Sequence, residues 1–400
     1  MRIAFFTDAF LPQINGVVSY VVDVTTWLTK KGHTVIVYAP KPRRNFHIDV
    51  SQFPFRLVLL PSLPSPIYPD IRITIPSLPK ILRDLKRSHI DVVHINDPWT
   101  VCMDGVEAAK LLRIPIVMTY HTFFLDTDML KNIRFGKILT ALRKPLSRLI
   151  TFFHNYADVV ICPSFTAQKE LEKYGLKTAT VVLPNGIDLS RIRRLKSAEI
   201  VQRRAEFGLS SKDFVGLYVG RLSADKSVDF LIRAWKNVVR SHPSAKLLLV
   251  GTGPKEKDMK KLVRMQKLQS AVFFAGSIER DSLLSSGLYS MADIFITASK
   301  IENQSIAMIE AMAHGLPIVA VDMRGSKELV DSTNGYLVPP DSMDAMSHAI
   351  LTLMKSSKKR QLLRNGSLFR AKEFSSSTVV SKLEGTYFAL SRGKKYIPSS

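Results

Sequence analysis

The feature that most constrains this chain is an alternation of short apolar runs with stretches of helical periodicity. Residues 2–7 and 34–39 are such runs, and a helical pattern lies between them. Runs that are apolar throughout and separated by helices are typical of a parallel sheet covered on both faces. We therefore expect an α/β fold. Further strands of this first series are expected at residues 92–95, 115–120, 158–162 and 180–183.

The alternation occurs twice. A polar stretch at residues 184–188 ends the first series, and a second begins with the apolar run at 214–219. We expect two tandem, Rossmann-like, doubly wound domains, residues 1–187 and 188–375. Residues 376–400 should form a helix that crosses back to the first domain, plus a short basic tail. Ligands of open α/β sheets bind at the carboxyl ends of the strands, so we expect a ligand cleft between the domains. The other strands of the second series are expected at residues 246–250, 272–274, 294–297 and 317–321.

Two stretches lack the alternation. Residues 61–79 contain six prolines, and proline cannot donate a hydrogen bond within a sheet. We expect a loop there. The basic stretch 190–212 is expected to be a linker with one helical piece.

The charge of the chain is unusual for 400 residues. Lys and Arg number 57 against 34 Asp and Glu, which gives a net charge of +23. Such an excess favours an anionic partner, either a nucleic acid or an acidic membrane surface. Because there is no helix-turn-helix, zinc-finger or aromatic-basic RNA signature, we expect no nucleic-acid partner. No apolar run reaches the ~20 residues that span a bilayer.

The ends and the cysteines favour a cytoplasmic protein. Met1 leads straight into the strand at residues 2–7, which leaves no room for a signal peptide. Cys102 and Cys162 are far apart and lie in apolar settings, which fits a reducing compartment and predicts neither a disulfide nor a metal site.

Two carboxylates eight residues apart give the strongest functional signal. If Ser305 caps the helix that follows, Glu302 lies in the loop before it and Glu310 in its second turn. Carboxylates accept hydrogen bonds from sugar hydroxyls, and a helix N-terminus favours phosphate. The pattern therefore predicts a sugar-nucleotide site. Both could instead be surface charges, but the surrounding helix is largely apolar.

Arg221 and Lys226 lie in the loop after the first strand of the second domain. A guanidinium and an ammonium at that position can neutralise a diphosphate. In the first domain, Asn15 and Gly16 precede a helix, where glycine allows a backbone amide to approach phosphate or sugar. That loop lacks G-x-G-x-x-G, which disfavours a dinucleotide cofactor, and we expect no cofactor.

His121 ends a buried strand, where a side chain faces the ligand edge of the sheet, so we expect it to contact the ligand. His94 also lies near a strand end and is expected to be structural or to face an acceptor.

A helical region over residues 128–156 carries an apolar stripe opposite basic residues. Pro145 should kink or restart this helix. The helix could pack on the core with a solvated basic face, or it could lie on anionic lipid. The net charge favours the membrane, as does a second basic patch at residues 80–87. The membrane-facing residues are predicted to be Lys131, Arg134, Lys137, Arg143, Lys144 and Arg148.

Together these motifs resemble the retaining enzymes of glycosyltransferase family 4, which have the GT-B fold. The E-x7-E motif matches Glu302 and Glu310, and the basic loop matches Arg221 and Lys226. The resemblance implies that Glu310 holds the nucleotide ribose and Glu302 a donor hydroxyl or the phosphate region. It implies catalytic roles for His121, Glu302, Arg221 and Lys226, with no metal. The donor-binding residues that it implies are Asn15, Gly16, Arg221, Lys226, Glu302, Asn303, Gln304, Ser305 and Glu310.

Within the family, the chain is most similar to lipid glucosyltransferases that act on diacylglycerol, with phosphatidylinositol mannosyltransferases close behind. Two departures concern the donor: Asn303-Gln304-Ser305 follows Glu302, and Ser227 follows Lys226 where many members have Gly. The expected reaction is transfer of a hexose, glucose favoured, from a UDP-sugar to a membrane lipid, at the inner face of the cell membrane. The alternatives are a GDP-mannose-dependent mannosyltransferase and, more distantly, a sugar phosphorylase, a nucleotide-sugar epimerase or a nucleic-acid-binding protein.

Overall fold

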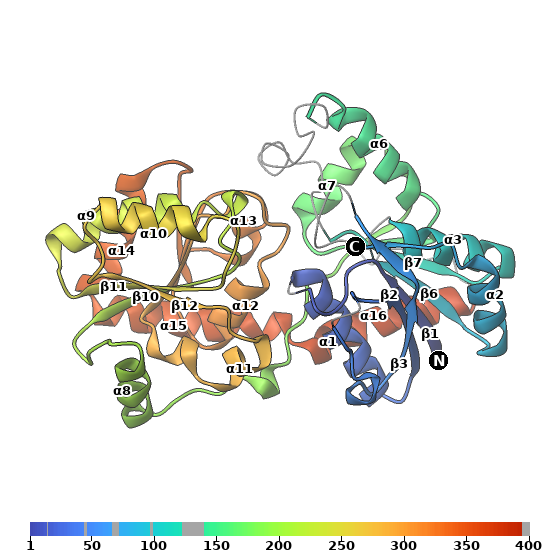
Figure 1. The fold of residues 1–400 in the computed structure, drawn as a ribbon, viewed down its shortest axis with the longest axis horizontal. Coiled ribbons are helices and arrows are strands. Elements are labelled where there is room, and N and C mark those ends of the chain that lie inside the picture. Colours follow the sequence, from blue (N-terminus) through green and yellow to red (C-terminus); the bar gives the residue numbers. More distant parts are fainter. Residues whose placement is uncertain (14, 44–45, 66–71, 97–98, 122–139, 394–400) are drawn as a thin grey trace. The chain divides into compact units, whose positions relative to one another are not determined.

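The computed structural model describes residues 1–13, 15–43, 46–65, 72–96, 99–121 and 140–393. The chain divides into two compact units (Figure 1). The N-terminal unit comprises Met1–Gly186 and the C-terminal helix α16 (Ser376–Ser391), and the C-terminal unit comprises Ile187–Ser375. Both contain a parallel sheet with helices packed on it, so the predicted α/β class is confirmed.

The N-terminal unit has a seven-stranded parallel sheet in the order β3-β2-β1-β6-β7-β8-β9. Its five inner strands are buried almost throughout, and in β1 only Arg2 is exposed, whereas the edge strands β3 and β9 are mostly half-buried. Such uniformly apolar strands are expected where both faces of a sheet are covered. The strands are β1 (Arg2–Thr7), β2 (Thr34–Pro40), β3 (Arg56–Leu60), β6 (Val92–Asn96), β7 (Ile116–Thr119), β8 (Val159–Cys162) and β9 (Thr180–Val182).

The prediction of a single proline-rich loop after β2 was wrong in part. β4 (Ser62–Pro64) and β5 (Arg72–Thr74) form an antiparallel pair within it. The edge strand β3, whose sequence is apolar but short and which ends directly before Pro61, was also not predicted. Proline is tolerated at strand ends and in short edge pairs, so its presence alone does not exclude strands.

Helices α1 (Gly16–Lys30) and α16 cover one face of this sheet, and α2 (Leu78–Arg87) and α3 (Thr100–Leu112) cover the other. Successive side chains of β1 point to opposite faces of the sheet and therefore pack against different helices. Phe5 joins the core with α1 and α16, whereas Phe6 lies against Gly105 of α3, where an added Cβ would lie 2.6 Å from its ring. Helices α6 (Arg143–His154) and α7 (Phe165–Lys173) complete the described part of the unit.

The C-terminal unit has a six-stranded parallel sheet in the order β12-β11-β10-β13-β14-β15. Strand β10 faces two cores in turn: Val215 and Leu217 lie in one, and Phe214 and Tyr218 in the other. Gly216 makes room for Trp235, since a Cβ there would lie 2.6 Å from the indole. The strands are β10 (Phe214–Val219), β11 (Ala245–Val250), β12 (Val272–Gly276), β13 (Ile294–Thr297), β14 (Ile318–Val321) and β15 (Gly335–Val338).

Helices cover both faces of this second sheet as well. α9, α10 and α14 contribute to one core, and α11 and α12 to the other. Strand β15 and the short helix α13 were not predicted. The helices are α8 (Ser197–Glu206), α9 (Val228–Ser241), α10 (Glu256–Met265), α11 (Arg280–Ser285), α12 (Ile306–Ala313), α13 (Ser326–Leu329), α14 (Met343–Lys355) and α15 (Ser357–Ala371).

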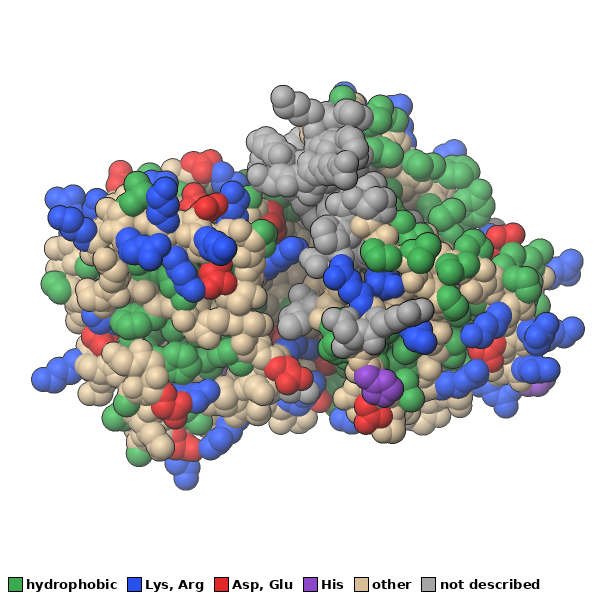
Figure 2. Space-filling model, in the orientation of Figure 1, with side chains coloured by type: hydrophobic (Ala, Val, Ile, Leu, Met, Phe, Trp, Pro, Cys, Tyr) green, Lys and Arg blue, Asp and Glu red, His purple; other side chains and the backbone are tan. Residues whose placement is uncertain are grey.

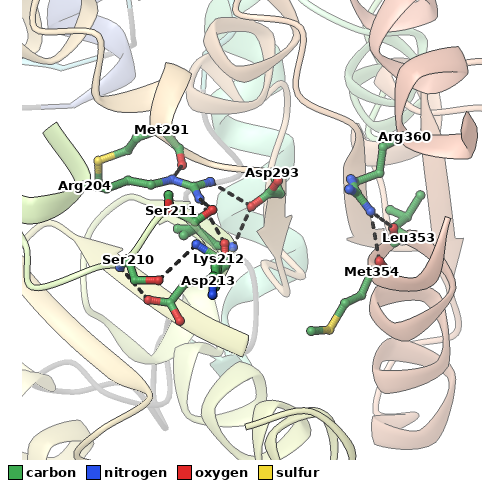
Figure 3. Close-up of polar contacts among 11 residues, drawn as sticks. Arg204, Ser210, Ser211, Lys212, Asp213, Met291, Asp293, Leu353, Met354 and Arg360 are labelled. Carbon is green, nitrogen blue, oxygen red and sulfur yellow. Dashed lines mark hydrogen bonds and ion pairs between the residues drawn. The ribbon is translucent and has the colours of Figure 1, made fainter. Parts of the chain in front are cut away.

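The predicted linker at 190–212 is fixed to the C-terminal unit through Arg204 of α8 (Figure 3). Its buried guanidinium forms an ion pair with Asp293 at 3.0 Å and donates to the carbonyl oxygens of Met291 at 2.8 Å and Asp213 at 3.0 Å. A buried cation with its donors satisfied in this way holds α8 in place. Residues 190–212 are therefore an integral part of the C-terminal unit.

Figure 3 also shows a second arginine that donates to backbone carbonyls. Arg360 of α15 donates to the carbonyl oxygens of Leu353 and Met354 at the end of α14.

Candidate functional site

Two loops at the carboxyl edge of the C-terminal sheet meet through an ion pair. Lys226, after β10, lies 2.6 Å from Oε1 of Glu302, after β13, and 3.7 Å from Asp225. Burial alone would lower the pKa of Lys226, but the charges of Glu302 and Asp225 outweigh it and the pKa is raised. Lys226 therefore stays charged, in the position expected for a cation that binds phosphate.

Helix α12 begins as predicted. Ser305 is its N-cap, and the Ser305 hydroxyl accepts a hydrogen bond from the backbone N–H of Met308. Glu302 lies in the preceding loop and Glu310 in the second turn. The other N–H groups of the first turn have no partner within the helix, which is the arrangement that favours an anion.

The predicted ribose ligand Glu310 is only 3% exposed, and its carboxylate already has two partners. Nε of Arg280 donates to Oε1 at 2.7 Å, and the hydroxyl of Tyr289 donates to Oε2 at 2.8 Å. Burial, followed by the charge of Glu310, raises the pKa of Tyr289, so its phenol stays protonated. Each carboxylate oxygen still has a second lone pair.

Sequence reasoning missed Arg280 and Tyr289. Arg280 is the first residue of α11, shortly after β12 ends. Arg221 was selected because it lies near the carboxyl edge of the sheet. The same criterion would have selected Arg280. Tyr289 carries no such signal, because its contact with Glu310 depends on how a 3-10 turn packs beneath α12.

The remaining predicted donor residues of this unit lie in the same two loops. Arg221 is exposed at the start of the first loop, Asn303 is buried and Gln304 is half-buried. The loop after β14 packs on the backbone of the second loop, because the N–H of Gly325 donates to the carbonyl of Glu302 at 3.2 Å. A Cβ on Gly325 would lie 1.9 Å from the carbonyl oxygen of Asn303, so this position requires glycine.

Ser227 adopts a left-handed backbone conformation, with φ of 49° and ψ of 40°, immediately before α9. This region favours glycine, because a Cβ approaches the following carbonyl. Ser227 thus replaces the glycine that many family members have after Lys226, but its backbone keeps the conformation that glycine favours.

In the N-terminal unit, His121 follows the end of β7. Its Nε2 lies 2.9 Å from Oδ1 of Asn96, and the ring of Tyr20 lies edge-on at 4.7 Å. Burial, followed by the charge of His154, lowers the pKa of His121 to about 3. The imidazole is therefore neutral at physiological pH.

Asn15 and Gly16 lie where α1 begins. The side chain of Asn15 accepts a hydrogen bond from the N–H of Val18 at 3.0 Å, so it serves as the N-cap. Gly16 is the first helical residue and is exposed, one position earlier than the helix start predicted at Val17.

His94 is fully buried and its contacts are structural. One ring nitrogen is bonded to the hydroxyl of Tyr387 on α16, and the other lies 2.7 Å from the hydroxyl of Thr119. Its pKa is lowered by burial and then by His121. The C-terminal helix is thus attached to the centre of the N-terminal sheet.

Three of the predicted membrane residues, Lys131, Arg134 and Lys137, lie outside the described residues. Arg143, Lys144 and Arg148 lie on α6, which has Pro145 in its first turn, where a missing N–H costs little.

The described part of the predicted apolar stripe is only partly covered. Leu142 and Leu149 are 47% and 61% exposed, whereas Leu146, Ile150 and Phe153 are half-buried. The buried residues of α6 are Thr151 and His154, and Phe152, outside the stripe, is 57% exposed. On the face seen in Figure 2, apolar side chains gather over the region of α6 and α3, with Lys and Arg beside them.

Two features are absent from the part of the chain that the structure describes. No described helix has the length and hydropathy needed to cross a membrane. Nor do any three described His, Cys, Asp or Glu side chains cluster in a way that could hold a metal ion.

Comparison with known families decides the class of this chain. The profile described as Glycosyltransferase Family 4 matches residues 14–191, and the profile described as Glycosyl transferases group 1 matches residues 200–367. The chain belongs to glycosyltransferase family 4. It is a hexosyltransferase that uses a nucleotide sugar, as the sequence predicted.

Similar proteins of this glycosyltransferase family include two kinds of enzyme. The α-monoglucosyldiacylglycerol synthase of Streptococcus pneumoniae is 28% identical over 80% of this chain and 71% of its own length. A GDP-mannose-dependent α-mannosyltransferase of Mycobacterium tuberculosis is 27% identical over 88% of each chain. The structure of Anabaena HepE in complex with UDP matches with a TM-score of 0.77 and 20% identity, over 97% of this chain and 100% of HepE, which confirms the GT-B fold.

Proposed function

We propose that this glycosyltransferase moves glucose from UDP-glucose to a diacylglycerol-type lipid, with retention at the anomeric carbon. The observation that carries the donor half is the contact between Lys226 and Glu302 beside the N-terminus of α12. A fixed cation and a set of helical N–H groups at one sheet edge suit a diphosphate. The glucosyldiacylglycerol synthases among the similar proteins support the sugar and the acceptor.

The proposed chemistry rests on charge stabilisation. Negative charge builds on the departing diphosphate, and Lys226, Arg221 and the N-terminus of α12 would stabilise it. The ion pair with Lys226 neutralises Glu302, which would otherwise repel the phosphates, and the rest of that carboxylate would accept from a donor hydroxyl.

We propose that Glu310 binds the ribose through its remaining lone pairs, with Arg280 and Tyr289 fixing its orientation. Retention would follow from attack of the acceptor hydroxyl on the same face that the diphosphate leaves. The departing phosphate would take the proton from the acceptor. This scheme needs no protein nucleophile, unlike that of retaining hydrolases.

The acceptor half of the proposal rests on α6. On this helix the exposed Leu149 and Phe152 follow Arg143, Lys144 and Arg148, a composition suited to the interface of an anionic membrane. We propose that the N-terminal unit binds the inner face of the cell membrane peripherally and receives the lipid there. Asn15, Gly16 and His121 are proposed to contact the donor from this unit.

The second candidate is transfer of mannose from GDP-mannose to phosphatidylinositol or another acceptor, which the similar mannosyltransferases favour. One experiment separates the two. The purified full chain is incubated with radiolabelled UDP-glucose, UDP-galactose or GDP-mannose over anionic vesicles that contain diacylglycerol or phosphatidylinositol. We expect label from UDP-glucose in the organic phase with diacylglycerol, and label from GDP-mannose alone would contradict the proposal. If the enzyme, incubated without any lipid acceptor, released a nucleotide sugar with a changed sugar, it would be an epimerase.

A further inference from the structure

Three buried serines follow neighbouring strands at the carboxyl edge of the C-terminal sheet. Ser223 follows β10, Ser299 follows β13 and Ser326 follows β14, and these three strands are adjacent in the sheet. The residues are 6%, 1% and 1% exposed. No group in the described part of the chain forms a hydrogen bond with any of the three hydroxyls, and burial keeps water from them. Buried polar groups are nearly always paired, so three unpaired hydroxyls at one edge need a physical reason.

Buried serines within the helices of the same unit are paired. The hydroxyl of Ser347, on α14, lies 2.7 Å from the carbonyl oxygen of Met343 and 3.0 Å from that of Ala234. The hydroxyl of Ser367, on α15, donates to the carbonyl oxygen of Leu316 at 2.7 Å. The unpaired serines of this unit therefore lie in the loops at the carboxyl edge.

Ser223 belongs to the loop that carries Lys226. Its carbonyl oxygen accepts a hydrogen bond from the backbone N–H of Lys226 at 3.2 Å. Ser223 also occupies the N-cap position of the 3-10 turn Ala224–Lys226, but its hydroxyl does not cap that turn. A serine in this position ordinarily uses its hydroxyl as a cap, so the local structure leaves the hydroxyl for another partner.

The other two serines lie in loops that meet at Glu302. Ser299 precedes Glu302 in the loop after β13. Ser326 follows Gly325, whose backbone N–H donates to the carbonyl oxygen of Glu302 at 3.2 Å. Because Lys226 also contacts Glu302, the three loops are joined, and a shift of one loop would move the other two.

Two residues in these loops have a strained backbone. Ser227 has φ of 49° and Arg324 has φ of 41°, in the left-handed region that favours glycine. Strain of this kind gathers at ligand-binding sites. Both the strain and the unpaired hydroxyls raise the free energy of the folded chain, and a ligand that supplies acceptors to these hydroxyls would lower it.

We propose that Ser223, Ser299 and Ser326 are donor-binding residues whose hydroxyls donate to the diphosphate of the nucleotide sugar. The inference rests on the proposed function, which places the diphosphate beside Lys226. Phosphate oxygens accept hydrogen bonds, and a serine hydroxyl gives one without adding a charge beside the pair of Lys226 and Glu302. Because the hydroxyls are covered in this structure, the loops shift when the diphosphate binds, and each hydroxyl then gains its partner.

Calorimetric titration of the full chain with UDP tests this proposal, with GDP titrated in parallel. Ser223→Ala, Ser299→Ala and Ser326→Ala each remove one donor. We expect each variant to weaken the binding of UDP about tenfold, as for a hydrogen bond to a charged group. Ser347→Ala is the matched control, and we expect it to bind UDP as the wild type does. Wild-type affinity in all three edge variants would overturn the proposal.

Unfolding by urea without nucleotide tests whether the hydroxyls are unpaired before binding. Removal of a buried hydroxyl that has no partner costs no hydrogen bond, whereas removal of a paired hydroxyl does. We therefore expect the three edge variants to unfold at urea concentrations no lower than the wild type, and Ser347→Ala to unfold at a lower one. If all four variants unfolded at equally lowered concentrations, the edge hydroxyls would be bonded within the folded chain, and the proposal would be wrong.

The same titrations separate this proposal from the proposed function. If Lys226→Ala lost affinity for UDP while the three edge variants kept it, the diphosphate would still bind at this edge and the serines alone would lose their role. If the wild type bound GDP and not UDP, the proposed glucose donor would be wrong. The affinity of the three edge variants for GDP would then decide the role of the serines.

Discussion

The carboxyl edges of the two sheets differ in the polar side chains that follow their strands. In the C-terminal unit, Lys226 is charged and pairs with Glu302 at 2.6 Å. In the N-terminal unit, burial lowers the pKa of His121, after β7, to about 3, so that its ring is neutral. The difference concerns these two edges alone, because His314 in the C-terminal unit also has a pKa lowered by burial, to about 4. It supports the proposal that the C-terminal edge binds the anionic part of the nucleotide sugar.

Removing the cation of the C-terminal unit should have the largest effect. Lys226→Ala deletes a fixed positive charge and leaves Glu302 facing the phosphates. We expect kcat for hexose transfer to fall about 10²–10³-fold, the usual cost of losing one electrostatic contact to a developing anion. The measurement is steady-state transfer from the labelled donor to lipid.

Lys255→Ala is the control for this variant. Lys255 belongs to a loop of the same unit but pairs with Asp258 on the surface, with a side chain that is 44% exposed. We expect wild-type rates from it. If Lys226→Ala retained more than a third of wild-type kcat, the cationic loop would have no part in the chemistry.

Neutralising Glu310 should be costly in stability as well as in binding. Glu310→Gln leaves Arg280 without its counter-charge, and the loss of one partner of a buried pair costs about 3 kcal/mol or somewhat less where the cation is partly exposed. We expect this loss in the free energy of unfolding by urea, together with a higher KM for the donor.

Glu256→Gln is the matched change at the surface, where Glu256 pairs with Lys260 on α10. Exposed pairs four residues apart contribute about 0.5 kcal/mol or less. Equal destabilisation by the two variants would mean that Glu310 behaves as an ordinary surface charge.

Acid should act on the N-terminal unit through its histidines. A histidine whose pKa is lowered on folding takes up fewer protons than the unfolded chain, so stability is complete above about pH 6.5 and falls as the pH drops toward 4. For His154 we expect a loss of up to ~1.4 kcal/mol per pH unit in that window. Unfolding by urea at pH 7, 6 and 5 measures it.

The comparison for this prediction is between wild type, His154→Gln and His348→Gln. His154→Gln keeps a donor for the carbonyl of Ile150 but cannot titrate, so its stability should depend less on pH. His348 is exposed on α14, and its replacement should change nothing. Identical pH dependence of all three proteins would remove the histidines from the account.

The smallest expected effect concerns the membrane. A basic residue near an acidic surface contributes about 1 kcal/mol, so the double change Lys144→Ser and Arg148→Ser should weaken partitioning into anionic vesicles about 30-fold. Co-sedimentation with vesicles measures it. Removing the exposed Lys257 and Lys261 from the C-terminal unit alters the net charge equally, and we expect little change. If both double variants weakened vesicle binding equally, the net charge of the chain alone would explain the binding.

Much of the fold could be predicted from the sequence because its strands are apolar throughout. β1 and β10, for example, have the predicted bounds. The strands that were missed are short or at edges: β3 is an edge strand, β4 and β5 lie among prolines, and β15 follows a polar turn. Such elements are determined by their neighbours more than by their own pattern.

The residues of the candidate site also fall into those that the sequence predicted and those that it did not. Sequence spacing predicted Ser305 as a cap and selected Glu302 and Lys226, which the structure brings into contact. Arg280 and Tyr289 were missed, because each contacts Glu310 from at least 21 residues away in the sequence. The roles assigned to these residues in binding and catalysis remain predictions.

A crystal structure of the full chain soaked with UDP tests the central claim most directly. We expect the diphosphate within hydrogen-bonding distance of Lys226 and Arg221, at the N-terminus of α12, with the ribose hydroxyls against Glu310. A nucleotide bound elsewhere on the chain, with Lys226 still engaged only by Glu302 and Asp225, would contradict it.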